Sequence, residues 1–270
     1  MNTFGGIETK TRELLARIVR QSKSTVTVEE AATVLKFPRL QVAKLMARWA
    51  EQGWLFRIRR GLYAPVPLQA KTTSTAAEDP WIIANSIFRP CYMGGWSAVE
   101  HWGLTEQIFK TIIVLTTRSI GQRKIKLQAN EFWIKKIAPS HFFGMKVVWR
   151  ERVQIQISDP TKTIIDLLDD PVIGGGARMV SEILNNYLSS SSKNLEQLLD
   201  YADRMKNGAI YKRLGFFLER GQKIEDPVLS KLQKRLTAGN AKLDPSMQCN
   251  RLVSRWRLWV PENWKEVKRD

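Results

Sequence analysis

The chain has 270 residues, with 43 Lys or Arg against 26 Asp or Glu, and therefore a formal net charge of +17. With 43% hydrophobic residues and ten Trp it can bury a core of one or two domains, which excludes a wholly disordered chain. Two cysteines are too few for a disulfide framework. Because the N-terminus lacks a signal-peptide pattern and no apolar run reaches the roughly 20 residues of a membrane span, we expect a cytoplasmic protein.

Positive charge is concentrated at both ends of the chain. Residues 1–70 hold 12 basic and 5 acidic residues, and residues 171–270 hold 18 and 11. Such an excess attracts polyanions through long-range fields and counterion release, so nucleic acid is the expected partner class. A membrane surface is the weaker alternative, because no segment pairs a Lys/Arg face with a clean apolar face.

Three helices are predicted near the N-terminus. Helical spacing and cap residues place them at Thr9–Arg20, at Val28–Leu35, and from Pro38 to about Gln52. The second opens with a capping box formed by Thr27 and Glu30, and the third has Gly53 as its C-cap. This succession is typical of a tri-helical helix-turn-helix.

Two short β-prone runs follow the third helix. They span Trp54–Ile58 and Leu62–Ala64, and the basic, Gly-containing connection Arg59-Arg60-Gly61 joins them as a hairpin. The helices alone fit a plain helical hairpin equally well. The hairpin directly after them favours a winged helix-turn-helix over residues 1–68.

The third helix has two distinct faces. Four apolar side chains fall within one arc and are expected to pack on the other two helices: Val42, Leu45, Met46 and Trp49. The opposite face carries donors suited to phosphates and to base edges in a major groove. The candidate DNA-binding residues on this helix and the hairpin are Arg39, Gln41, Lys44, Arg48, Arg57, Arg59 and Arg60. A solvated charged face is the alternative, which the basic hairpin makes less favoured.

A linker and a second domain complete the chain. Residues 69–79 carry no large apolar side chain and are the predicted linker, so the second domain covers residues 80–270. Its predicted helices are 81–88, 96–102, 161–168, 177–188, 195–205, 209–219 and 227–235. Its predicted strands are 111–117, 131–137, 146–149, 153–157 and 254–260. Strands before a block of helices, with one returning strand, indicate an α+β class with a small sheet and a C-terminal helical block.

No catalytic residue, metal site or cofactor is predicted. His101 and His141 have no Cys, Asp or Glu at metal-ligand spacing around them. The run Gly174-Gly175-Gly176 lacks the pattern of a P-loop. Ser97 follows two glycines, but Val99 stands where a nucleophile elbow needs Gly.

Three acidic features are expected to have no catalytic role. Asp159 and Asp166 are better explained as helix caps or surface charge than as an acid–base pair. Glu266-Val267-Lys268 has the form of a nuclease ExK triplet, yet one such triplet is expected by chance in a chain this rich in Lys and Glu. A metal-dependent nuclease therefore remains only as an alternative, since basic DNA-binding proteins with mixed domains include nucleases.

Several stretches together form a recognisable set. They are 53–57 (GWLFR), 60–63 (RGLY), 79–84 (DPWIIA), 96–107 (WSAVEHWGLTEQ), 158–166 (SDPTKTIID) and 214–218 (LGFFL). This set resembles the AbiEi-type regulators, which are antitoxins of abortive-infection (type IV) toxin–antitoxin systems. The resemblance covers most of the chain, and the combination of the hairpin with the central stretches is its most specific part.

The resemblance implies a bacterial protein of phage defence whose winged helix binds an inverted-repeat operator and represses its own operon. The second domain would then counteract a co-encoded nucleotidyltransferase toxin. The DNA-contacting role falls on the seven candidate residues named above, and no catalytic residue carries over. An interaction module that neutralises the toxin, with DNA binding as a secondary property, is the further alternative.

Overall fold

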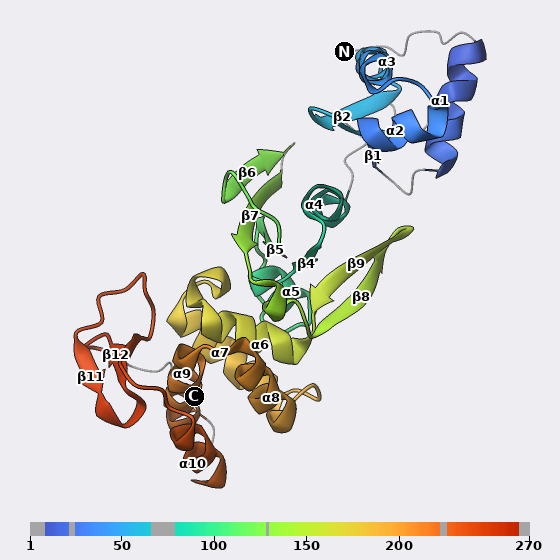
Figure 1. Cartoon of the computed structure of the whole chain (residues 1–270). Helices are drawn as coiled ribbons and strands as arrows, with labels where there is room; N and C mark the ends of the chain where they lie inside the picture. Colours follow the sequence, from blue (N-terminus) through green and yellow to red (C-terminus); the bar gives the residue numbers. More distant parts are fainter. Residues whose placement is uncertain (1–8, 22–24, 66–78, 128–129, 222–225, 265–270) are drawn as a thin grey trace.

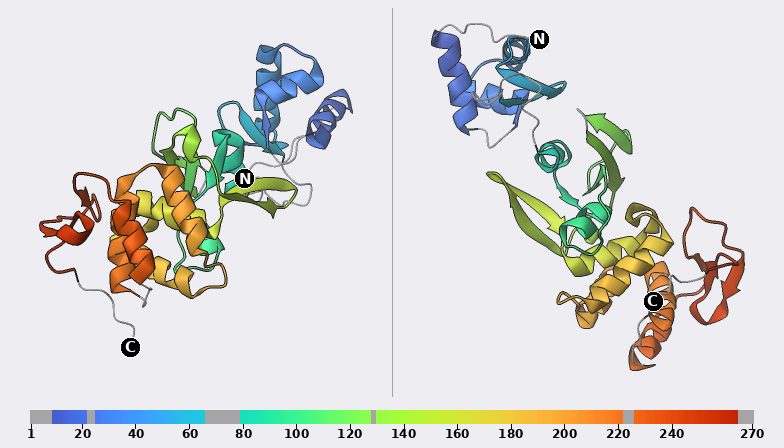
Figure 2. Two further views of the ribbon diagram at one scale, coloured as in Figure 1. Left: turned by 60° about the horizontal axis from the view of Figure 1, so that its bottom comes forward. Right: turned by 180° about the vertical axis from the view of Figure 1, so that it is seen from behind.

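The computed structural model describes residues 9–21, 25–65, 79–127, 130–221 and 226–264. They form an elongated molecule in which an N-terminal unit, a central sheet and a C-terminal helical block follow one another (Figure 1). The views in Figure 2 show the same succession. The predicted α+β class is confirmed.

The N-terminal unit consists of helices and a small antiparallel sheet. Its elements are α1 (Thr9–Gln21), β1 (Val26–Thr27), α2 (Val28–Leu35), α3 (Arg39–Glu51), β2 (Leu55–Arg59) and β3 (Leu62–Pro65). The three strands lie in the order β1-β3-β2. The predicted helices and hairpin are therefore present, and the two-residue strand β1, which was not predicted, adds an edge strand to the hairpin.

Local hydrogen bonds explain where the helices of this unit begin. The backbone N–H of Glu30 donates to the Thr27 hydroxyl at 3.1 Å and the Glu30 carboxylate accepts from the Thr27 N–H at 2.8 Å, which completes the predicted capping box. Helix α3 begins at Arg39, one residue later than predicted, because Pro38 is its N-cap. Gly53 follows the C-cap residue with φ 82°, a left-handed conformation that favours glycine.

The predicted apolar face of α3 is the centre of this unit's core. Val42, Met46 and Trp49 are fully buried, and they pack with residues of α1, α2 and the sheet. Trp54 is half-buried against the same cluster. The helical spacing read from the sequence thus assigned the buried face of α3 correctly.

The central part is a mixed six-stranded sheet in the order β6-β7-β5-β4-β9-β8. Its strands and accompanying helices are α4 (Pro80–Phe88), β4 (Cys91–Met93), α5 (Gly95–His101), β5 (Thr111–Thr116), β6 (Lys124–Leu127), β7 (Asn130–Lys136), β8 (Met145–Arg150) and β9 (Val153–Ser158). The pairs β5–β7 and β4–β9 are parallel, and the other neighbouring pairs are antiparallel.

Both faces of the middle strands are covered. On β5, Val114 packs with α4 on one face, whereas Ile113 packs with the helical block on the other. Both side chains are 0% exposed. This burial explains why β5 is a continuous β-branched run rather than an alternating one.

The C-terminal part is a block of helices with a second small sheet. Its elements are α6 (Pro160–Asp169), α7 (Ala177–Ser189), α8 (Leu195–Met205), α9 (Gly208–Arg220), α10 (Asp226–Lys234), β10 (Ala241–Lys242), β11 (Arg251–Val253) and β12 (Leu258–Val260). The prediction of a strand over residues 254–260 is wrong for its first half. Residues 254–256 form a 3-10 turn, which ends at Arg257 with φ 49°. This turn buries Trp256 beside α9, where Gly215 leaves room for the indole ring.

The predicted linker falls largely in a part of the chain that the structure does not describe. Of residues 69–79 only Asp79 is described, and its carboxylate accepts a hydrogen bond from the Trp81 N–H at 2.8 Å as the N-cap of α4. The Asp79-Pro80 pair therefore starts this helix as the sequence predicts.

Candidate nucleic-acid interface

The outward face of α3 carries the polar candidates. Gln41, Lys44 and Arg48 are all exposed, on the side opposite the buried residues of the same helix. Leu40 is also 72% exposed and offers an apolar group beside them. Hydrogen-bond donors with an adjacent apolar group are what a helix needs to contact base edges and thymine methyls in a major groove.

Arg39 is exposed but has a partner within the protein. Its Nε donates to the Glu29 carboxylate on α2 at 2.7 Å, and the two side chains are 73% and 60% exposed. A phosphate that approaches Arg39 would therefore compete with Glu29. The sequence did not reveal this pair, because its members come from two different helices.

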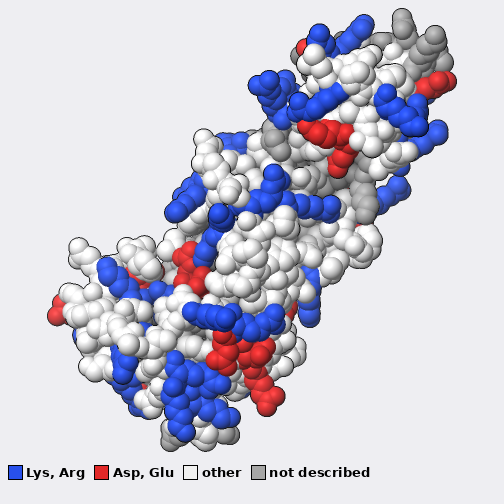
Figure 3. Space-filling model, in the orientation of Figure 1, with Lys and Arg blue, Asp and Glu red and all other residues white. Residues whose placement is uncertain are grey.

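The hairpin β2–β3 adds cations next to α3. Arg57 and Arg60 are exposed, and Arg59 is the last residue of β2. Gly61 has φ 80° at the connection between the strands, where an L side chain would be strained. Lys and Arg side chains are spread over the visible face of the N-terminal unit and of the central part (Figure 3). The DNA-binding role of these residues stays a prediction.

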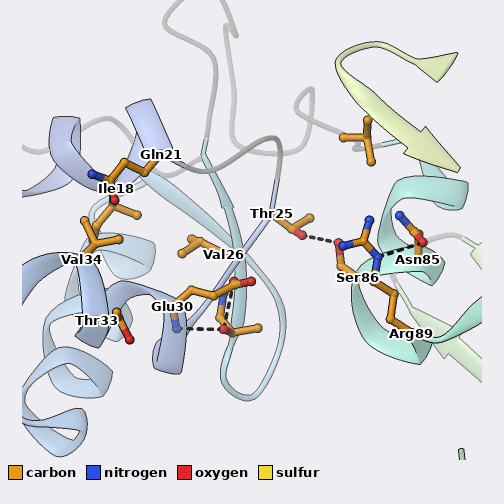
Figure 4. A pocket seen from close by; sticks show the side chains of 12 residues that line it. Ile18, Gln21, Thr25, Val26, Glu30, Thr33, Val34, Asn85, Ser86 and Arg89 are labelled. Atoms are coloured by element: carbon orange, nitrogen blue, oxygen red, sulfur yellow. Dashed lines mark hydrogen bonds between the residues drawn. The ribbon is translucent and has the colours of Figure 1, made fainter.

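The N-terminal unit contacts the second part of the chain directly. The hydroxyl groups of Thr25 and Ser86 are hydrogen-bonded to each other across the junction (Figure 4). On β3, Leu62 and Ala64 are buried in the cluster that contains α4. Next to these contacts is a pocket of about 500 Å³ between α1, α2 and α4. The contacts of Thr25, Leu62 and Ala64 with the second part of the chain therefore help to fix the orientation of the N-terminal unit.

The stretch 158–166 forms a buried polar network. The Asp159 carboxylate caps α6 by accepting from the Lys162 N–H at 2.7 Å and also accepts from the Tyr201 hydroxyl at 2.9 Å. Lys162 forms a buried ion pair with Asp166. The Tyr92 hydroxyl donates to Asp166 at 2.9 Å, and burial together with the Asp166 charge raises the pKa of Tyr92. The expectation of a cap is correct for Asp159, but Asp166 is neither a cap nor a surface charge.

The stretch 96–107 also supports the fold through hydrogen bonds. The Ser97 hydroxyl accepts from the Ile113 N–H at 2.9 Å. The Trp102 indole donates to the Ser158 carbonyl at 2.7 Å. Both bonds hold α5 against the sheet, so Ser97 has a structural role.

The glycine run 174–176 directly precedes α7. The N-terminus of this helix is hydrogen-bonded to a carboxylate from a distant part of the chain. The Ala177 N–H donates to Asp244 at 2.9 Å. A carboxylate at this place satisfies a helix N-terminus in the way that a bound anion would.

The described residues contain neither a metal-binding cluster nor a membrane-spanning helix. No group of three or more His, Cys, Asp or Glu side chains in those ranges could hold a metal ion. None of their helices is both long and apolar enough to cross a bilayer. The triplet Glu266-Val267-Lys268 lies outside the described ranges.

The comparison with protein families bears on the unit that carries α3. Residues 13–66 match the family model of the transcriptional regulator, AbiEi antitoxin. The match begins within α1 and extends through β3, and there it confirms the resemblance predicted from the sequence. The stretches 79–84, 96–107 and 158–166 lie beyond the matched segment.

The fold of the whole chain occurs in a solved structure. The crystal structure of the Rv2827c protein from Mycobacterium tuberculosis superimposes with a TM-score of 0.62 and covers 94% of this chain and 92% of its own. At 14% sequence identity this similarity shows a shared fold. No curated protein matches the chain.

Proposed function

We propose that this protein is a cytoplasmic transcriptional repressor and antitoxin, with a winged helix-turn-helix over residues 1–68 and a regulatory domain over residues 80–270. One observation carries the proposal: the segment that matches the AbiEi regulator family is the unit whose helix α3 presents Gln41, Lys44 and Arg48 on its outward face. The family description names both a transcriptional regulator and an antitoxin.

In the proposed complex, α3 lies in the major groove of one half-site of an inverted repeat in the protein's own promoter. Lys44 and Arg48 contact bases or phosphates, and the hairpin with Arg57 and Arg60 lies along the backbone. Binding of this kind weakens steeply as salt rises, because each neutralised phosphate releases counterions.

Substitution of the outward-facing cations tests the DNA-binding role. We expect Lys44→Ala and Arg48→Ala each to weaken operator binding by about 1–3 kcal/mol if the side chains reach base edges. Lys193→Ala, which removes an exposed cation between α7 and α8, is the control and should bind as the wild type does. Unchanged affinity of both α3 variants would refute the proposal. A shallower salt slope with retained sequence preference would restrict the two residues to phosphate contacts.

The antitoxin role is tested separately, in the full-length chain. We expect the Lys44→Ala/Arg48→Ala double variant to lose repression of its promoter while it still protects cells that express the co-encoded nucleotidyltransferase toxin. Deletion of residues 1–68 is a poorer test, because Leu62 and Ala64 form part of the core around α4. Loss of protection by a normally folded double variant would show that antitoxicity depends on DNA binding.

A further inference from the structure

A pocket at the open edge of the six-stranded sheet is not used by the proposed repressor function. It has a volume of about 330 Å³ and lies between α5, the start of β5, and the strands β6 and β7. The side chains that matter for its chemistry are Trp96, Thr111, Lys124, Lys126, Glu131 and Trp133. Strand β6 is at the end of the sheet, so the pocket can be reached from the side.

Aromatic rings held in place form one wall of this pocket. Trp96 stacks on Phe109 with ring centroids 5.2 Å apart and an interplanar angle of 7°. Trp133 meets Trp96 edge-on at 5.7 Å. The Trp96 indole N–H donates to the Thr111 carbonyl at 2.5 Å. Both indoles are only half-buried, although their neighbours restrict how they can move.

Cations lie over the same wall. Lys124 and Lys126 are exposed, and because they are two residues apart on a strand they project from one face, about 7 Å apart. The Lys124 ammonium is 4.8 Å from the centroid of the Trp133 ring, so a face of this ring is directed at the pocket. Glu131 is the one carboxylate among the residues that line the pocket; it accepts a hydrogen bond from the Thr111 hydroxyl at 3.4 Å and lies opposite Lys126 on the neighbouring strand. From Gln107 to Glu131 the sequence holds five Lys or Arg and this single acidic residue.

We propose that this pocket binds a nucleotide of single-stranded nucleic acid. The base stacks on Trp133 in the place over the ring that Lys124 now occupies, and the ammonium groups of Lys124 and Lys126 contact the adjoining phosphates. Sequence-tolerant binding of single strands combines these two features, aromatic platforms and a cationic groove.

Two simpler roles would use only part of the pocket. Lysines on an edge strand discourage edge-to-edge association of sheets, but this role requires neither a cavity nor an accessible indole. An acidic peptide would pair with the lysines, but it would gain nothing from the flat Trp133 ring. The proposed site is distinct from the duplex-binding surface proposed on α3.

The first experiment measures binding of a fluorescein-labelled dT 10-mer to the full-length protein by fluorescence anisotropy. We expect Lys124→Ala/Lys126→Ala to weaken binding by about fivefold or more, the scale of one lost stacked base or its phosphate contacts. Lys136→Ala is the matched control, because Lys136 is an exposed cation on β7 outside the pocket. Lys44→Ala/Arg48→Ala should also leave this binding intact. Equal affinities of the pocket variant and the Lys136 control would overturn the proposal.

The second experiment separates stacking from charge. An oligomer of the same length built from abasic units keeps every phosphate and loses every base, and we expect the wild-type protein to bind it about fivefold or more weakly. Trp133→Leu, which keeps an apolar side chain without a ring, should remove this preference for bases. Equal binding of the abasic and the dT oligomers would refute stacking. Displacement of labelled dT by polyglutamate as efficiently as by unlabelled dT would likewise show that only charge is recognised.

Discussion

At the scale of single residues, the pair of Lys162 and Asp166 shows what the stretch 158–166 contributes. Lys162 is 0% exposed and Asp166 is 3% exposed. The Lys162 ammonium also donates to the Tyr92 hydroxyl at 3.1 Å and lies 5.0 Å from the centroid of the Phe143 ring. The opposite charges of Lys162 and Asp166 offset each other, and the Tyr92 hydroxyl is hydrogen-bonded to both, so the pair joins α6 to the sheet through satisfied polar groups.

Removal of one charged side chain of this pair should lower the free energy of unfolding more than removal of both. Asp166→Ala leaves the Lys162 ammonium buried without its counterion, and we expect a loss of about 3–5 kcal/mol in the free energy of unfolding. The double variant Lys162→Met/Asp166→Leu leaves no uncompensated charge and should be more stable than the single one. Urea denaturation measures both. A double variant less stable than Asp166→Ala would show that the pair itself stabilises the fold.

The two cysteines should differ in reactivity. Burial raises the pKa of Cys91 to about 12, and the nearby charges of Arg89 and Arg118 oppose this shift only in part. Since the thiolate is the nucleophile, Cys91 should resist iodoacetamide at pH 8 in the folded protein, whereas the half-buried Cys249 should react. Mass spectrometry of the labelled peptides reads out each site, and both should react in urea. Rapid labelling of Cys91 without denaturant would contradict the packing of β4.

The sequence was informative about single residues where a period or a local helix-cap motif governs them. Helical spacing placed Lys44 and Arg48 opposite the core of α3, and neither side chain is buried. It could not show that Arg39 pairs with Glu29, or that Asp166 is buried, because both facts depend on contacts between different elements. The pocket beside Trp133 was missed for the same reason, since its walls come from α5, β6 and β7.

At the scale of elements, the capping box of α2 offers a direct test of the N-terminal unit. Thr27→Ala removes the hydroxyl that accepts from the Glu30 N–H, and we expect a loss of about 1 kcal/mol in the free energy of unfolding. Thr33→Ala in the same helix is the control. The Thr33 hydroxyl only donates to a helix carbonyl, that of Glu29, so its loss should change stability by less than about 0.5 kcal/mol. Equal effects of the two variants would show that the cap is not stabilising.

Long elements were predictable, and short ones that depend on distant partners were not. Helices of nine or more residues, such as α7 and α9, have enough turns for an apolar stripe. The strand β4 has only three residues, and its position is set by pairing with β5 and β9. Strand β6 alternates Lys with apolar residues. This period-2 pattern is hard to recognise in the sequence, because it is short and lies in a stretch rich in basic residues.

At the scale of the whole molecule, the strand β3 joins the two proposed domains. Tyr63 packs with the helices of the N-terminal unit, whereas Leu62 and Ala64 pack with α4. Alternating side chains on one strand thus belong to two cores. No local sequence pattern could reveal this division between two cores, because the residues of a strand buried on both faces are apolar whichever element packs on each face.

This shared strand predicts that a change in the N-terminal unit is transmitted to the second one. Leu62→Ala opens a cavity against α4, so we expect faster amide hydrogen exchange in residues 80–88. Leu45→Ala, in the cluster around α3, is the control and should leave these amides unchanged. Hydrogen exchange followed by mass spectrometry resolves the peptides. If both variants leave α4 protected as in the wild type, the packing of β3 on α4 does not couple the units. If Leu62→Ala alone loosens α4, a ligand that shifts β3 will also alter α4, because the strand and the helix share one apolar cluster.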